Sequence, residues 1–167
     1  MFRRFVRVAG LVAVVALVAA AAATADAGGN GTVTITTIGH NDTLFSFPVT
    51  NPCTGASGTL TAVSANDVFH VTFFTAPGAD EFWVTGTGEG TATFTPDDPT
   101  GISASGHFAA WFGESGNNKN DVQHDTNNFQ LIGSDGSRTT VHAVDHLSTN
   151  ANGVVTVSFS NFTFSCG

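Results

Sequence analysis

An alternation of apolar and polar residues runs through most of the chain from Thr32 onward. β-Branched and aromatic residues take every second position, and threonine or serine fills many of the positions between them, as in Thr32 to Thr36. A period of two is typical of strands that place one face on a core. No stretch of helical length in this region carries an apolar helical stripe. The sequence therefore predicts an all-β domain.

The alternating segments are separated by turn-forming residues. Asp135-Gly136 and Asn152-Gly153 are the strongest turn signals, because tight hairpins need positive φ angles. We expect about eight to ten short strands in one domain, with no linker and no fixed repeat. The expected strands are Thr32–Thr36, Leu44–Val49, Phe69–Phe74, Phe82–Val84, Thr91–Phe94, Ser103–Phe112, Val122–Ile132, Thr139–Leu147 and Val154–Phe164.

The N-terminus has the features of a secretory signal peptide. Three arginines, Arg3, Arg4 and Arg7, precede an apolar run over residues 8–23, and small residues suited to cleavage end at Ala25 and Ala27. The run is shorter than the roughly 20 residues of a membrane-spanning helix, which argues against the alternative of an uncleaved anchor. We expect residues 1–27 to be removed, leaving a secreted, extracellular domain over residues 28–167 with no stable membrane insertion.

The charge balance restricts the partners. The whole chain carries five basic and thirteen acidic residues, a net charge of −8, and removal of residues 1–27 leaves Lys119 and Arg138 against twelve acids, a net charge of −10. Nucleic-acid sites need several Lys or Arg contacts to phosphates, so we expect no nucleic-acid partner. No phosphate-binding loop or nucleophile motif is present, and no cofactor is expected.

Cys53 and Cys166 are the only cysteines of the chain. Two cysteines in an exported protein predict one disulfide, with free thiols or an intermolecular bridge as the alternatives. Consecutive hairpins favour an up-and-down meander, and a bridge from Cys53 to Cys166 would bring its two ends together. We therefore expect a single antiparallel up-and-down barrel of about eight strands, with a β-sandwich as the alternative.

Histidines offer two candidate sites. His142 and His146 have a spacing that would suit zinc on a helix, but on a strand their Cα atoms lie about 13 Å apart, so we expect no metal site there. A two-residue turn at Asp135-Gly136 would place His146 opposite Asp125 and His142 opposite Phe129. Asp125 could then orient His146 as a catalytic base, whereas the alternative is a polar pair on a solvated face.

The aromatic content allows for a ligand. Thirteen Phe and two Trp lie beyond residue 27, and they serve either as ordinary core or as the lining of a barrel cavity for a small apolar ligand. The favoured function is a non-catalytic, disulfide-closed β-barrel that acts as a binding or surface module. The alternative is a small extracellular isomerase or hydrolase that uses barrel-mouth histidines with Asp125 and His146.

A family resemblance rests on several segments: Phe47–Gly55, Trp111–Glu114 with Asn117 and Asn118, Gly133–Ser137, the pair His142 and His146, and Cys166. Together they resemble a family of small, uncharacterised secreted actinobacterial proteins. The resemblance covers residues 45–167 and implies export, a β-rich fold and the pairing of Cys53 with Cys166, and it implies no activity.

Overall fold

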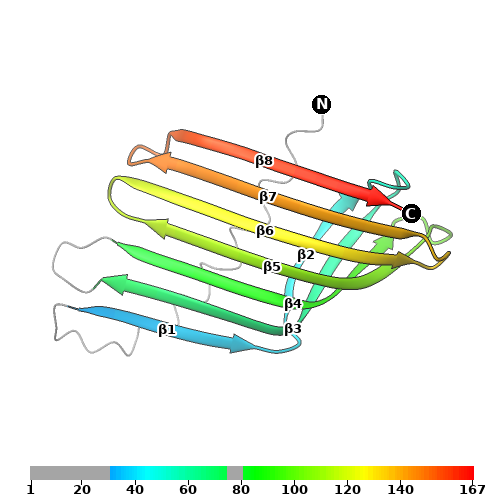
Figure 1. The fold of residues 1–167 in the computed structure, drawn as a ribbon, viewed down its shortest axis with the longest axis horizontal. Coiled ribbons are helices and arrows are strands. Elements are labelled where there is room, and N and C mark those ends of the chain that lie inside the picture. The colour runs from blue at the N-terminus through cyan, green and yellow to red at the C-terminus, as the bar shows by residue number, and fades with distance from the viewer. Residues whose placement is uncertain (1–30, 75–80) are drawn as a thin grey trace.

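A computed structural model describes residues 31–74 and 81–167 of the chain. The predicted signal peptide, residues 1–27, lies outside these described residues. All eight elements are strands of one antiparallel sheet, which confirms the all-β prediction (Figure 1). The strands are β1 (Thr32–Gly39), β2 (Thr43–Thr50), β3 (Ser57–Phe74), β4 (Phe82–Pro96), β5 (Ala104–Gly116), β6 (Asn120–Gly133), β7 (Arg138–Asn150) and β8 (Val155–Cys166).

Strands β3 and β4 are longer than the alternation indicates. The segments expected as separate strands at Phe82–Val84 and Thr91–Phe94 are the two ends of β4. Gly86, Gly88 and Gly90 lie between them and stay extended, because β4 is paired on both sides, with β3 and with β5. Glycine weakens an isolated strand, but here neighbouring strands hold the backbone.

Strand β3 has different partners along its two halves. Its first half pairs with β2 and its second half pairs with β1, while its other edge pairs with β4 throughout. A β-bulge between Ser64 and Asn66 marks the change of partner. From β3 to β8 each strand pairs with the next, as expected for a meander. The exception to the predicted hairpin order is β1, which pairs with β3 instead of β2.

The connection from β1 to β2 is anchored at this bulge. Asn41 has a φ angle of 60° and donates its backbone N–H to the carbonyl of Ser64. The backbone N–H of Ser64 donates to the carbonyl of Asp42, and its hydroxyl donates to the buried carboxylate of Asp67 at 2.6 Å. These bonds satisfy backbone groups that the bulge leaves without ladder partners.

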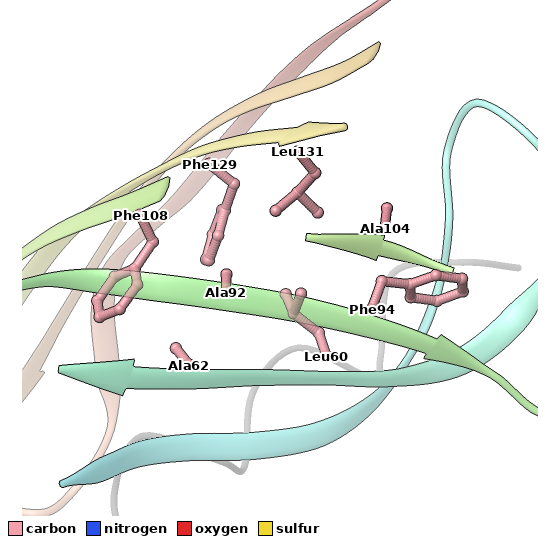
Figure 2. Packing of buried hydrophobic residues seen from close by; sticks show 8 residues of the cluster. All are labelled: Leu60, Ala62, Ala92, Phe94, Ala104, Phe108, Phe129 and Leu131. Atoms are coloured by element: carbon pink, nitrogen blue, oxygen red, sulfur yellow. The ribbon is translucent and has the colours of Figure 1, made fainter. Parts of the chain in front are cut away.

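The hydrophobic core lies at the end of the sheet that contains β2. Phe94 and Phe108 are its largest fully buried hydrophobic side chains, and Figure 2 shows them with Phe129 and with smaller residues of β3 to β6. From β2, Phe45 reaches across to the rings of Phe108 and Phe129, with centroids 6.0 Å away in both cases. The sheet thus curves so that β2 packs over β5 and β6.

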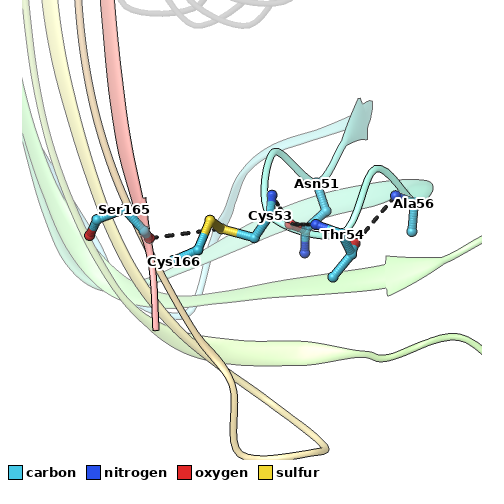
Figure 3. The surroundings of a disulfide bond; sticks show 6 residues. All are labelled: Asn51, Cys53, Thr54, Ala56, Ser165 and Cys166. Carbon is cyan, nitrogen blue, oxygen red and sulfur yellow. Dashed lines mark hydrogen bonds between the residues drawn. A yellow bond between two sulfur atoms is a disulfide. The ribbon is translucent and has the colours of Figure 1, made fainter.

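The sheet is not closed by hydrogen bonds, so the predicted barrel is not confirmed. Strand β8 pairs with β7 alone, and all twelve of its residues are exposed. The predicted disulfide is confirmed: Cys53, which follows β2, is bonded to Cys166 at the end of β8 (Figure 3). A covalent bond, in place of a ladder of hydrogen bonds, therefore joins the two edges at the core end.

We expect substitution of Gly90 by alanine to destabilise the fold by about 1 to 3 kcal/mol. A Cβ atom at this position would lie 2.2 Å from the carbonyl oxygen of Val63 and 2.6 Å from the backbone nitrogen of Ala65. Both atoms belong to the backbone at the bulge, so neither can move alone. Urea unfolding of the purified variant measures the loss.

Gly88→Ala is the matched control on the same strand and face. Its nearest obstacle would be the Cδ1 atom of Leu44 at 2.7 Å, the end of a side chain that can rotate away. Its effect should therefore be the smaller of the two. Equal losses of stability in Gly88→Ala and Gly90→Ala would show that the contact with the backbone is not the cause of the destabilisation.

Candidate functional site: a row of rings on the exposed face

The predicted pairing of Asp125 with His146 is wrong by one residue. The observed partners are Asp125 with Asp145, His124 with His146 and Asn128 with His142. Neighbours along a strand point to opposite faces, so Asp125 and His146 lie on opposite sides of the sheet. The candidate catalytic pair therefore has no geometric basis, and His142 is not opposite Phe129.

The one-residue difference in register is caused by an extra residue in the turn between β6 and β7. The N–H of Gly133 bonds to the carbonyl of Ser137, which leaves three residues in the loop instead of two. Gly136 takes the left-handed conformation with a φ angle of 86°, and Asp135 accepts hydrogen bonds from the N–H and hydroxyl of Ser137. A three-residue loop with glycine at its last position shifts the register by one and exchanges the faces.

The sheet register defines two faces with different chemistry. One face, here called the core face, carries Phe94, Phe108 and Phe129. The other, here called the ring face, carries five of the six histidines, because directly paired residues share a face. These five are His70, His107, His124, His142 and His146.

Four side chains of the ring face form a continuous row across β5 to β8. The ring centroids are 5.5 Å apart between Trp111 and His124, 5.7 Å between His124 and His146, and 5.4 Å between His146 and Phe159. The last two rings are stacked, with an interplanar angle of 14°. We call these four residues the ring row. It supplies one ring from each of four adjacent strands.

The ring row is accessible to solvent. Trp111 is 40% exposed and Phe159 is 48% exposed, while the two histidines between them are partly buried. A Cβ atom on Gly113 would lie 2.7 Å from the Trp111 ring, so the indole lies over this glycine. A side chain at position 113 would displace the indole. The glycine thus lets the indole lie along the sheet surface.

The histidines of the ring face differ in their hydrogen bonds. Nδ1 of His142 lies 2.7 Å from Oδ1 of Asn128, and Nδ1 of His70 lies 2.9 Å from the hydroxyl of Thr36. Within the described residues, the ring nitrogens of His124 and His146 have no hydrogen-bond partner. Their nitrogens are therefore available to a ligand that approaches the ring face.

The core face carries an acidic strip directly behind the ring row. We define this strip by Glu114, Asp121, Asp125 and Asp145, which come from β5, β6 and β7. Burial, followed by the negative charge of Asp121, raises the pKa of Glu114, and burial also raises the pKa of Asp121. Burial raises the pKa of Asp125 as well, and the charge of Asp145 adds to that effect.

We expect Asp125→Asn to stabilise the protein at neutral pH. Because the folded-state pKa of Asp125 is raised, folding favours the protonated form, and the charged form opposes folding above that pKa. The free energy of unfolding of the wild type should therefore rise as pH falls through the pKa that Asp125 has in the folded state. This rise should level off below the pKa that Asp125 has in the unfolded state. The variant should lack this part of the pH dependence, measured by urea unfolding between neutral pH and pH 4.

Asp98→Asn is the comparison variant, because the pKa of Asp98 is shifted in the opposite direction to that of Asp125. The backbone and side-chain hydrogen bonds from Thr100 lower the pKa of Asp98, so its charged form favours folding above the unfolded pKa. This variant should not gain stability at neutral pH. If Asp125→Asn also fails to gain, the acidic strip is not the source of unfavourable charge.

Two hollows on the surface of the described residues do not include the predicted catalytic residues. One of about 180 Å³ is lined by Glu81, Trp83, Ser115, Gly116, Asn117 and Asn120. Another of about 310 Å³ lies between β3, β4 and β5, beside Asp67 and Glu89. Asp125, His142 and His146 line neither of them. The part of the chain that the structure describes holds no helix of the length and hydrophobicity needed to cross a membrane.

Sequence reasoning considered His146 and missed its neighbours in the row. Trp111, His124 and Phe159 come from three other strands, and only the registers of three successive hairpins bring them together. A correct count of the Gly133–Ser137 loop would have placed His124 opposite His146. No local motif marks the ends of the row.

Comparison with protein-family models, curated proteins and solved structures gave no match. The resemblance to small secreted actinobacterial proteins therefore stays a prediction from the sequence.

Proposed function

We propose that this protein is a secreted, non-catalytic binding module whose ring row binds an uncharged glycan chain. The observation that carries the proposal is the placement of four exposed or half-exposed rings on adjacent strands, 5.4 to 5.7 Å apart. The pyranose ring of a neutral sugar gathers C–H groups on its faces and hydroxyls at its rim. Such a face stacks on an aromatic side chain.

The neighbours of the row suit the hydroxyl groups of a sugar. Thr85 and Thr126 lie on the same face of β4 and β6, and the free nitrogens of His124 and His146 can donate or accept hydrogen bonds. The strongly negative chain disfavours anionic polymers. The proposal keeps the expected apolar contact with a ligand but assigns it to the open sheet face instead of a barrel interior, and it does not require closure of the barrel.

The proposal is tested by co-sedimentation with insoluble cellulose and chitin, with soluble alginate as the anionic competitor. We expect saturable binding to a neutral polysaccharide, and Trp111→Ala should weaken it by about tenfold, which corresponds to about 1.4 kcal/mol. The tryptophan contributes the largest exposed ring of the row, so its loss should have the largest effect.

Ile132→Ala is the matched control. Ile132 is also exposed and lies on the ring face, but near the opposite end of β6 from His124. This variant should bind as the wild type does. Absence of binding to both polysaccharides, or equal binding by Trp111→Ala and wild type, would contradict the proposed function.

A further inference from the structure

We propose that His124 and His146 together bind a divalent transition-metal ion, with Zn²⁺ as the representative ion. The two histidines are direct cross-strand partners on β6 and β7 and project from the same face. The pair differs from the one that the sequence spacing suggests, because His142 lies four residues from His146 along the strand and is bonded to Asn128. The inference goes beyond glycan binding and does not depend on it.

The distance between the two imidazoles suits shared coordination. A zinc ion about 2.1 Å from an imidazole nitrogen lies about 3.2 Å from the ring centroid, so two rings at a tetrahedral angle have centroids about 5.2 Å apart, rising to about 6.4 Å as the angle opens. The observed separation is 5.7 Å. The proposal requires rotation about the last side-chain torsion, which is soft in histidine, to turn a nitrogen of each ring toward a common point.

The nitrogens are free to act as ligands. Neither His124 nor His146 has a hydrogen-bond partner among the residues that the structure describes, in contrast to His70 and His142. Trp111 flanks His124, and Phe159 stacks on His146, so the two rings on either side limit the positions that the imidazoles can adopt. A partly ordered pair loses less entropy when it binds an ion.

The charge around the pair favours a cation. Asp125 and Asp145 follow and precede the two histidines in sequence, and they face each other on the opposite side of the sheet. The negative charges of this strip are partly buried, and the net charge of the whole chain is −8. A divalent ion above the ring face would offset their mutual repulsion through the thickness of one sheet.

The site supplies two protein ligands and leaves the other positions to water. No group of three or more metal-ligating side chains comes together within residues 31–74 and 81–167. We therefore expect weaker binding than in a structural zinc site with four ligands.

The test is calorimetric titration of Zn²⁺ into the purified full chain, stripped with EDTA and carrying no polyhistidine tag. We expect one ion per chain, and His124→Gln and His146→Gln should each weaken binding by at least about tenfold. In NMR spectra of the wild type, the ring signals of these two histidines should shift on titration ahead of those of the other four.

His142→Gln is the matched control, since it removes an exposed histidine of the same face and strand as His146. It should bind zinc as the wild type does. Failure of zinc to bind up to about 1 mM, retention of affinity in His124→Gln, or an equal loss in His142→Gln would each overturn the proposal. The titration contains no polysaccharide, so its outcome is separate from that of the glycan test.

Discussion

Replacement of both Cys53 and Cys166 by serine should lower the free energy of unfolding by about 4 to 5 kcal/mol. The two residues are 113 positions apart, and their bond restricts the chain from β3 to β8 in the unfolded state. It also joins the edge near β2 to the end of β8, where the strands have no hydrogen bonds to each other. Urea unfolding of the double variant measures the loss.

Wild-type protein unfolded in the presence of a thiol reductant is the control for this variant. Both samples lack the bridge, so their unfolding midpoints should agree, and both should lie well below that of the oxidised wild type. A loss smaller than about 1 kcal/mol would mean that packing of β2 holds the sheet edges together without the bond.

Phe108→Ala should destabilise the protein by about 3 to 5 kcal/mol. The side chain is fully buried and its ring contacts Phe45 and Phe129, so its removal leaves a cavity between β2, β5 and β6. Loss of this ring also removes one of the two ring contacts by which Phe45 of β2 packs over β5 and β6. Urea unfolding with the disulfide intact measures the effect.

Phe162→Ala supplies the control with the same change of side chain. Phe162 is on the core face as well, but it lies on the edge strand β8 and is 53% exposed. Its substitution should change the free energy of unfolding by less than about 0.5 kcal/mol. Similar losses for the two variants would show that the core extends to β8.

The fold class followed from local patterns in the sequence. Alternation of residues such as Val33 and Ile35 with threonines depends only on the two faces of a strand, and the disulfide followed from a count of two cysteines. Strand boundaries from β5 onward agreed to within four residues for the same reason. These features require no knowledge of which strands are neighbours.

Two of the remaining differences arose where distant segments decide the structure, and one arose in a local turn. The glycines at positions 86, 88 and 90 remain in β4 because both neighbouring strands pair with them. The shared use of β3 by β1 and β2 depends on a bulge that the alternation does not reveal. The predicted catalytic pair is wrong because one additional loop residue shifts the register of β7 on β6. This shift places Asp125 and His146 on opposite faces of the sheet.

The two faces of the sheet separate core packing from surface chemistry along the same strands. On β5 and β6 the core face buries Phe108 and Phe129, and the ring face presents Trp111 and His124 at the surface. Substitution of an exposed ring therefore removes no side chain of the core. The surface of this sheet can be redesigned independently of its interior.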